Sequence, residues 1–122
     1  MNAHGDITLF WDGDLLIVKT FGPFNELGLK IIISKIRESI LNKGLESWRK
    51  MEIWDEETLG SPDVVATGEA VAKWYKDNGC IASAIIVCNS LQEQLVDKIT
   101  SNNTKSFRDQ ETAMNWLSLQ NT

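Results

Sequence analysis

The chain has 122 residues, of which 43% are hydrophobic and 24% are charged, as in an ordinary soluble globular domain. Its net charge of -5 argues against a nucleic-acid partner, because binding to a phosphate backbone depends on clustered Lys and Arg. No apolar run approaches the roughly 20 residues that span a bilayer, and the polar start lacks a signal-peptide core. We therefore expect no transmembrane segment and a cytoplasmic location.

The N-terminal part of the chain predicts an antiparallel strand pair and then a long helix. Ile7, Leu9 and Trp11 alternate with Thr8 and Phe10, as in a half-buried strand, and a second strand is expected over 14–20. The intervening Asp12-Gly13 is typical of a two-residue hairpin turn, whose central positions need positive φ. A helix with an apolar stripe should begin near Phe24-Asn25 and end at Lys43-Gly44.

Strands and helices alternate over the rest of the chain. Ser61 and Pro62 suit the N-cap and the first position of one helix, and a Ser-x-x-Glu capping box at Ser90 should begin another. The expected strands cover 48–54, 80–88 and 104–107, and the expected helices cover 62–77, the segment after Ser90 and the segment after Asp109.

The order β-β-α-β-α-β-α-β-α predicts one α/β domain over residues 1–122. Strands that alternate with helices are joined by right-handed crossovers, which make neighbouring strands parallel. We therefore expect an N-terminal antiparallel β-hairpin followed by βα units. Together they should form a mostly parallel sheet of about five strands with four helices.

Residues that could carry catalysis are scarce. His4 is the only histidine, so a Ser-His-Asp or Cys-His arrangement would depend on a residue close to the terminus. No group of His, Cys and carboxylates has zinc spacing, and no glycine-rich phosphate loop follows a strand. We therefore expect no metal site, no cofactor and no enzymatic activity.

The joint between the strand over 48–54 and the next helix is the candidate functional edge. Ligands and partners of α/β domains usually meet the chain beyond the carboxyl ends of strands. Ser61 has two open roles, a helix N-cap and a phosphorylation site whose charge would lie at a helix N-terminus. The adjacent acids are interpreted as solvated rather than as a metal site. The residues of this edge are Asp55, Glu56, Glu57, Gly60, Ser61 and Asp63.

Five tryptophans are many for a chain of this length. Trp48 and Trp54 have the same parity on one strand, so they should face the same side of the sheet. Trp74 belongs to the apolar stripe of the following helix. The tryptophans could fill a core, or an apolar ligand could bind beside Trp48, Trp54 and Trp74.

The order of elements, the segment Gly22-Pro23-Phe24-Asn25 and the ending Phe107-Arg-Asp-x-Glu-x-Ala-x-x-Trp-Leu117 resemble SpoIIAA-like proteins of the STAS (sulfate transporter and anti-sigma factor antagonist) superfamily. The resemblance covers essentially the whole chain and implies a single STAS/SpoIIAA-like domain. In antagonist members, a partner kinase phosphorylates a Ser in an Asp-Ser-Ser-Gly motif. The matching position here is Ser61, although Gly-Ser-Pro-Asp replaces that motif. Other SpoIIAA-like members imply lipid-like or other small apolar ligands.

Two hypotheses for the function remain open. The first is a non-catalytic regulatory or protein-interaction module that uses residues 55–61 and the following helix. The alternative is a carrier or sensor of a small apolar, lipid-like ligand. An enzyme that uses the acidic loop Asp55–Glu57 is the least supported hypothesis. A homodimer is compatible with the antiparallel edge strand and the many tryptophans.

Overall fold

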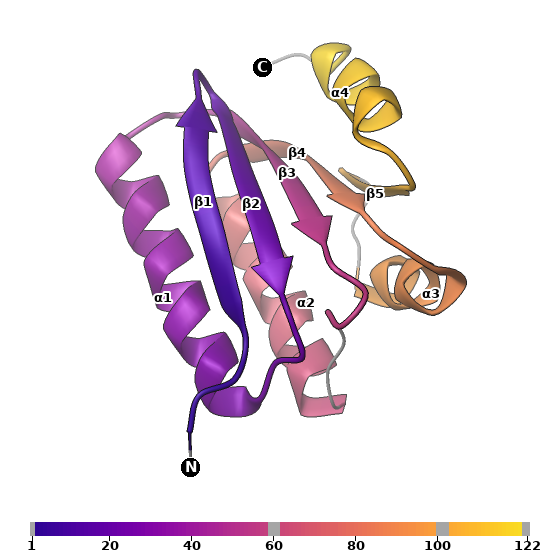
Figure 1. Cartoon of the computed structure of the whole chain (residues 1–122). Coiled ribbons are helices and arrows are strands. Elements are labelled where there is room, and N and C mark those ends of the chain that lie inside the picture. Colours follow the sequence, from indigo (N-terminus) through magenta and orange to yellow (C-terminus); the bar gives the residue numbers. More distant parts are fainter. Residues whose placement is uncertain (1, 59–61, 100–102, 121–122) are drawn as a thin grey trace.

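The computed structural model describes residues 2–58, 62–99 and 103–120 of the chain (Figure 1). No helix in this part of the chain is long and apolar enough to cross a membrane. The elements, in chain order, are β1 (Asp6–Asp12), β2 (Leu15–Phe21), α1 (Glu26–Lys43), β3 (Trp48–Trp54), α2 (Pro62–Asp77), β4 (Cys80–Ile86), α3 (Ser90–Ile99), β5 (Thr104–Phe107) and α4 (Gln110–Ser118).

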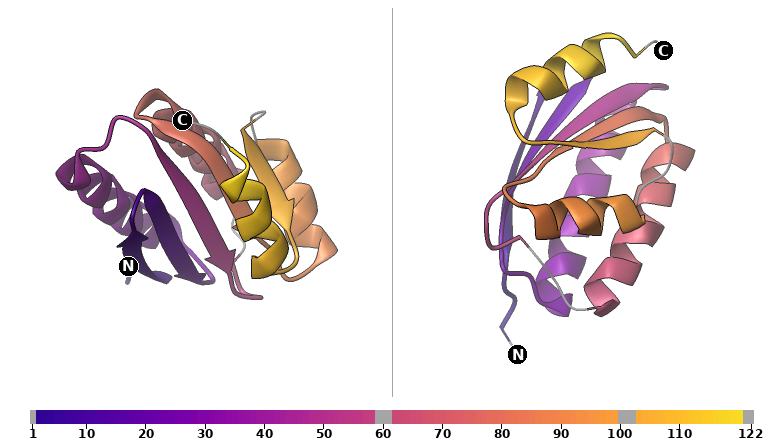
Figure 2. Two further views of the ribbon diagram at one scale, coloured as in Figure 1. Left: turned by 90° about the horizontal axis from the view of Figure 1, so that it is seen from above. Right: turned by 90° about the vertical axis from the view of Figure 1, so that its right-hand side faces the viewer.

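The strands lie in the sheet in the order in which they occur in the chain, β1-β2-β3-β4-β5. β1 is antiparallel to β2, and every later strand pair is parallel. Helices α1 and α2 cover one face of the sheet, α3 packs against α2 and β5, and α4 covers the opposite face over β3, β4 and β5 (Figure 2). The predicted α/β fold, with its N-terminal hairpin and mostly parallel sheet, is confirmed.

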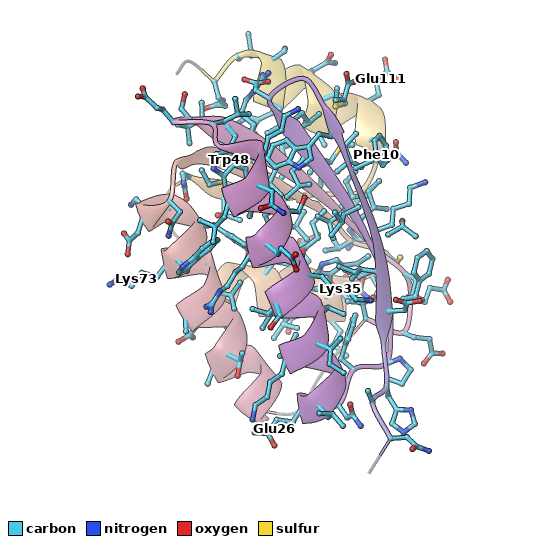
Figure 3. All side chains as sticks on the ribbon, turned by 90° about the vertical axis from the view of Figure 1, so that its left-hand side faces the viewer. Phe10, Glu26, Lys35, Trp48, Lys73 and Glu111 are labelled. Carbon is cyan, nitrogen blue, oxygen red and sulfur yellow. The ribbon has the colours of Figure 1, made fainter. Side chains whose placement is uncertain are left out.

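Two apolar layers enclose the sheet. On the side of α1 and α2, the core joins β1, β2 and β3 to both helices, and Trp48 is completely buried in it. On the side of α4, Met51 and Ala84 pack under Leu117 of that helix. Phe10 is 52% exposed and points away from α1 and α2 (Figure 3). The two faces of the sheet are therefore covered unequally, because α4 does not extend over β1 on its side of the sheet.

The ends of α1 follow the sequence prediction. The side chain of Asn25 accepts a hydrogen bond from the backbone N–H of Gly28, as an N-cap does. Gly44 adopts the left-handed conformation with φ 68°, and its N–H donates to the carbonyl of Ile40. Both caps satisfy backbone groups that the helix itself leaves unpaired.

Two local predictions were displaced by one residue. Asp12 pairs with Leu15, so the hairpin turn consists of Gly13 and Asp14 rather than Asp12 and Gly13. Only Gly13 has positive φ, at 61°, which fits a type II′ turn. The helix after β4 begins in the same displaced way. Its cap is Asn89 rather than Ser90, because the Asn89 side chain accepts from the N–H of Gln92 at 2.9 Å.

Asp109 caps α4, and this cap should depend on pH. Its carboxylate accepts bonds from the backbone N–H and the hydroxyl of Thr112, and these bonds lower the pKa of Asp109. A lowered folded-state pKa stabilises the fold above the unfolded carboxyl pKa of about 3.9, and this stabilisation is lost as pH falls through the folded value. We expect Asp109→Ala to lower Tm at pH 7, and the deficit to narrow below about pH 4.

Thermal unfolding followed by circular dichroism from pH 7 to pH 2.5 measures this dependence. Asp109→Asn is the matched control, since an amide oxygen can still cap the helix but does not titrate. At pH 7, the Tm of Asp109→Asn should differ from that of the wild-type chain by less than the Tm of Asp109→Ala does. An Asp109→Ala deficit of equal size across the whole pH range would contradict the assignment.

Candidate functional site

A pocket of about 140 Å³ lies between the sheet and helices α1 and α2. It is partly open to solvent, and its walls are mostly apolar. The wall residues come from both helices and from the sheet, and they include Leu29, Ile36, Trp54, Val71, Tyr75 and Ile85. Mostly apolar pockets with a few polar groups are the usual form of small-molecule sites. This pocket is therefore the leading candidate site in the described part of the chain.

A polar row crosses the sheet at the floor of this pocket. Lys50 of β3 pairs with Ser83 of β4, and Ser83 pairs with Thr104 of β5. Paired positions of neighbouring strands lie on one face of a sheet, and all three residues line the pocket. Glu52 follows Lys50 by two residues and lines it too. Charged and hydroxyl groups thus meet at one place beneath apolar walls.

Lys50 is a buried charge with two partners. The residue is only 3% exposed, and its Nζ lies 3.6 Å from Oε2 of Glu52. The same Nζ lies 4.6 Å from the centre of the Tyr75 ring, in cation–π geometry. Oε2 of Glu52 also accepts a bond from Nε1 of Trp54 at 3.1 Å. The ion pair is therefore shielded from water on several sides, where an unpaired charge would be costly.

The two buried titratable groups beside this ion pair, Cys80 and Tyr75, are neutral near pH 7. Burial raises the pKa of the Cys80 thiol to about 11, although the charge of Lys50 opposes the shift. Burial, together with the charge of Glu52 and then Cys80, raises the pKa of Tyr75 well above its usual value. The inner surface of the pocket thus carries one positive and one negative side chain, Lys50 and Glu52.

The acidic loop after β3 is built around Asp55. Its Oδ1 accepts bonds from the N–H of Gly22 at 3.1 Å, the N–H of Glu57 at 3.1 Å and the hydroxyl of Thr58 at 2.6 Å. A Cβ at Gly22 would collide with the carbonyl of Glu57, so the close approach of the two segments requires glycine. Asp55 therefore holds the loop against the end of β2.

Gln92 fixes the same loop from the other side, although no sequence pattern marks it as a site residue. Its side chain is fully buried. Its amide donates to the carbonyls of Asp55 at 2.8 Å and Thr58 at 3.2 Å, while its oxygen accepts from the N–H of Cys88 at 2.8 Å. The loop, the end of β4 and α3 are thereby joined through one side chain.

The residues of the predicted functional edge are placed differently from one another. Glu56 and Glu57 are exposed, whereas Asp55 is half-buried and uses its carboxylate within the loop. Gly60 and Ser61 lie outside the described residues, so their predicted roles, phosphorylation of Ser61 included, stay predictions. Asp63 lies in α2, but its side chain is not described. Among the described residues, no group of three His, Cys, Asp or Glu side chains could hold a metal ion.

The predicted aromatic ligand contacts also separate. Trp54 lines the pocket. Trp48 is buried beside it in the core, where its ring meets those of Trp11 and Tyr75 edge-on. Trp74 packs against Tyr75 and lies under the guanidinium of Arg37. Trp48 and Trp74 do not belong to the described pocket wall.

Lys50, Glu52 and Ser83 are site residues that the sequence analysis missed. A signal for the first two was present, because they have the same parity as Trp48 and Trp54 on one strand. These two charged residues lie between two tryptophans on the strand face that packs against the helices. Such a pattern indicates a buried polar group. Ser83 is the one hydroxyl in the strand Cys80–Ile86.

A comparison with solved structures supports the fold. The chain is similar to the crystal structure of an uncharacterised protein from the DUF3478 family with a SpoIIAA-like fold, from Shewanella loihica PV-4. The TM-score is 0.67 and the sequence identity 18%, over 96% of this chain and 97% of that chain. The SpoIIAA-like fold implied by the sequence resemblance is thus confirmed. No profile of a protein family and no curated protein matches the sequence.

Proposed function

We propose that this SpoIIAA-like chain is a binding protein that holds a small, largely apolar molecule in the pocket between its sheet and helices α1 and α2. One observation carries the proposal. A pocket of about 140 Å³ stays open where two helices and a sheet would normally pack without voids. Engineered cavities of roughly this size, about 150 Å³, accept benzene. The pocket is therefore large enough for a ring or a short chain.

Binding without catalysis fits the groups at hand. His4 is exposed, and its backbone N–H donates to the side chain of Asn25 near the start of α1. Asp55, which an enzyme acting through the acidic loop would need as an acid or base, already accepts three hydrogen bonds within the fold. The carboxylate of Asp55 therefore has a structural role in holding the loop, rather than a free position for acid–base catalysis. A regulatory or protein-interaction role through the exposed Glu56 and Glu57 remains a prediction.

A variant that fills the pocket tests the proposal. Ala72 of α2 lines the pocket, whereas Ala70 of the same helix is exposed. We expect Ala72→Phe to weaken the binding of toluene, used as a small apolar probe, by roughly tenfold or more, because the new ring occupies the same space. Ala70→Phe is the matched control, with the same substitution on the solvent side. Ligand-observed NMR titration measures both affinities.

A second measurement on the same proteins tests the proposal. Native mass spectrometry of the freshly purified wild-type chain should show either a small molecule already bound or the binding of added toluene, and Ala72→Phe should show neither. If both phenylalanine variants bound toluene as well as the wild-type chain does, the pocket would not be the binding site. If the wild-type chain bound no apolar probe, the proposal would be wrong.

A further inference from the structure

We propose, on the basis of the binding function above, that the pocket selects an uncharged molecule with one hydrogen-bond-accepting oxygen, such as a ketone, aldehyde or amide, and disfavours carboxylates. Lys50 and Ser83 would donate to that oxygen, and the apolar body of the molecule would lie against the walls. The inference rests on unused donors and on the balance of charge at the floor of the pocket.

Lys50 has donors to spare. A lysine ammonium carries three N–H groups and prefers acceptors within about 3.2 Å. Its ion-pair partner, Oε2 of Glu52, is 3.6 Å away, and its other partner is the face of the Tyr75 ring. These contacts stabilise the charge, but they leave its N–H groups without a hydrogen bond of good length. An oxygen in the pocket would complete them.

Ser83 points to the same place independently. Three buried side-chain polar atoms of the described residues have no hydrogen-bond partner, and only one of them, Oγ of Ser83, belongs to a residue of the pocket. Ser83 is 5% exposed and is the β4 partner of Lys50. Buried hydroxyls without partners are rare, because each costs the desolvation of a polar group. Lys50 and Ser83, which are paired across β3 and β4, thus both lack an acceptor at good hydrogen-bond distance.

The charge balance argues for a neutral ligand. Lys50 and Glu52 cancel each other on the inner surface of the pocket. A carboxylate that reached Lys50 would come close to the carboxylate of Glu52, and like charges repel strongly where water is excluded. Lys76 also lines the pocket, but it is exposed, so solvent and salt screen its charge. A carbonyl oxygen meets both donors without adding a charge.

Three ligands of similar size test the inference. Acetophenone, benzoate and α-methylstyrene each have a two-branched group on one benzene ring and the same number of non-hydrogen atoms, but carry a carbonyl, a carboxylate and no oxygen, respectively. We expect acetophenone to bind the wild-type chain roughly ten- to hundredfold more tightly than α-methylstyrene, because its oxygen can accept a hydrogen bond from the charged Lys50 ammonium, whose N–H groups lack an acceptor in the free protein. Benzoate should bind no better than α-methylstyrene. Isothermal titration calorimetry measures all three affinities.

Two variants connect the preference to the named donors. Ser83→Ala should reduce the acetophenone preference severalfold while leaving the Tm of the free protein unchanged or higher, because it removes a hydroxyl without a partner. A merely structural hydroxyl would instead lower Tm when removed. The pair Lys50→Met with Glu52→Gln, made together so that neither charge is left alone, should abolish the preference while α-methylstyrene still binds.

Each remaining result has a definite meaning. Tighter binding of benzoate than of acetophenone would overturn the inference and identify an anion site. Equal binding of acetophenone and α-methylstyrene, with both blocked by Ala72→Phe, would overturn it but leave the proposed binding function in place. A wild-type chain that binds none of the three would overturn both.

Discussion

Replacing Lys50 with methionine is expected to lower the free energy of unfolding by about 3–5 kcal/mol. The substitution keeps an unbranched chain of similar length but removes the ammonium that lies 3.6 Å from Glu52. The side chain of Glu52 is only 15% exposed, so its charge would be left without a counterion in a place that water reaches poorly. The cation–π contact with Tyr75 would be lost as well.

A double-mutant cycle separates the pair from the rest of the fold. Glu52→Gln keeps an oxygen for Nε1 of Trp54, and Lys50→Met with Glu52→Gln removes both charges together. We expect the double variant to be more stable than Lys50→Met alone, because no uncompensated charge remains. Urea unfolding followed by tryptophan fluorescence gives the free energies.

The outcome bears on the pocket as well as on the fold. If Lys50→Met cost less than about 1 kcal/mol, water would have to reach Glu52, and the pair would behave like an exposed one. The pocket could not then be the shielded polar floor that the proposed ligand selection needs. Ser83→Ala is the control for the row, since it changes a neighbouring pocket residue without touching either charge.

The regular elements could be predicted because their sequence signals are local. β3 and α2 span the residues 48–54 and 62–77 that were expected from the sequence. The hairpin turn could not be placed to the residue, since a distant contact takes part. Asp14 forms an ion pair with Arg49 at 2.6 Å, and Arg49 also donates to the carbonyl of Leu117. Such contacts join three elements that the sequence separates widely.

The prediction that Ser90 caps α3 was wrong for a similar reason. Ser90 and Asn89 are both good capping residues, so local propensity does not choose between them. In the fold, the hydroxyl of Ser90 accepts a bond from Arg108 at 3.3 Å, while Asn89 caps the helix. Arg108 follows β5 and reaches α3 only through the tertiary arrangement. Local capping rules therefore found the helix but displaced its first residue.

Only part of the candidate site could be predicted from the sequence. Strand parity alone places Lys50 and Glu52 on the face of Trp48 and Trp54. The neighbour of Lys50 on β4 depends on the register between the two strands, and that register shifts at Trp48 and Arg49. A shift of one residue exchanges the two faces of a strand, so Ser83 could not be assigned to the pocket beforehand.

Replacing Trp48 with alanine is expected to cost about 3–5 kcal/mol of the free energy of unfolding. Trp48 is fully buried, and its ring centre lies 5.8 Å from that of Trp11 and 6.1 Å from that of Tyr75. Its Nε1 donates to the carbonyl of Asn78 at 2.9 Å. The side chain thus joins β1, β3 and the end of α2, and its removal would leave a large void in a close-packed core.

Two matched variants show which part of Trp48 matters. Trp48→Phe keeps an aromatic ring but leaves the Asn78 carbonyl without its donor, and should cost about 1–3 kcal/mol. Trp74→Ala removes a half-buried indole from the adjacent helix and should cost less than Trp48→Ala, because solvent already reaches part of the ring. Urea unfolding followed by circular dichroism compares the three without relying on tryptophan emission. Equal costs for Trp48→Ala and Trp74→Ala would mean that Trp48 is not the centre of this core, and that its neighbours close the gap.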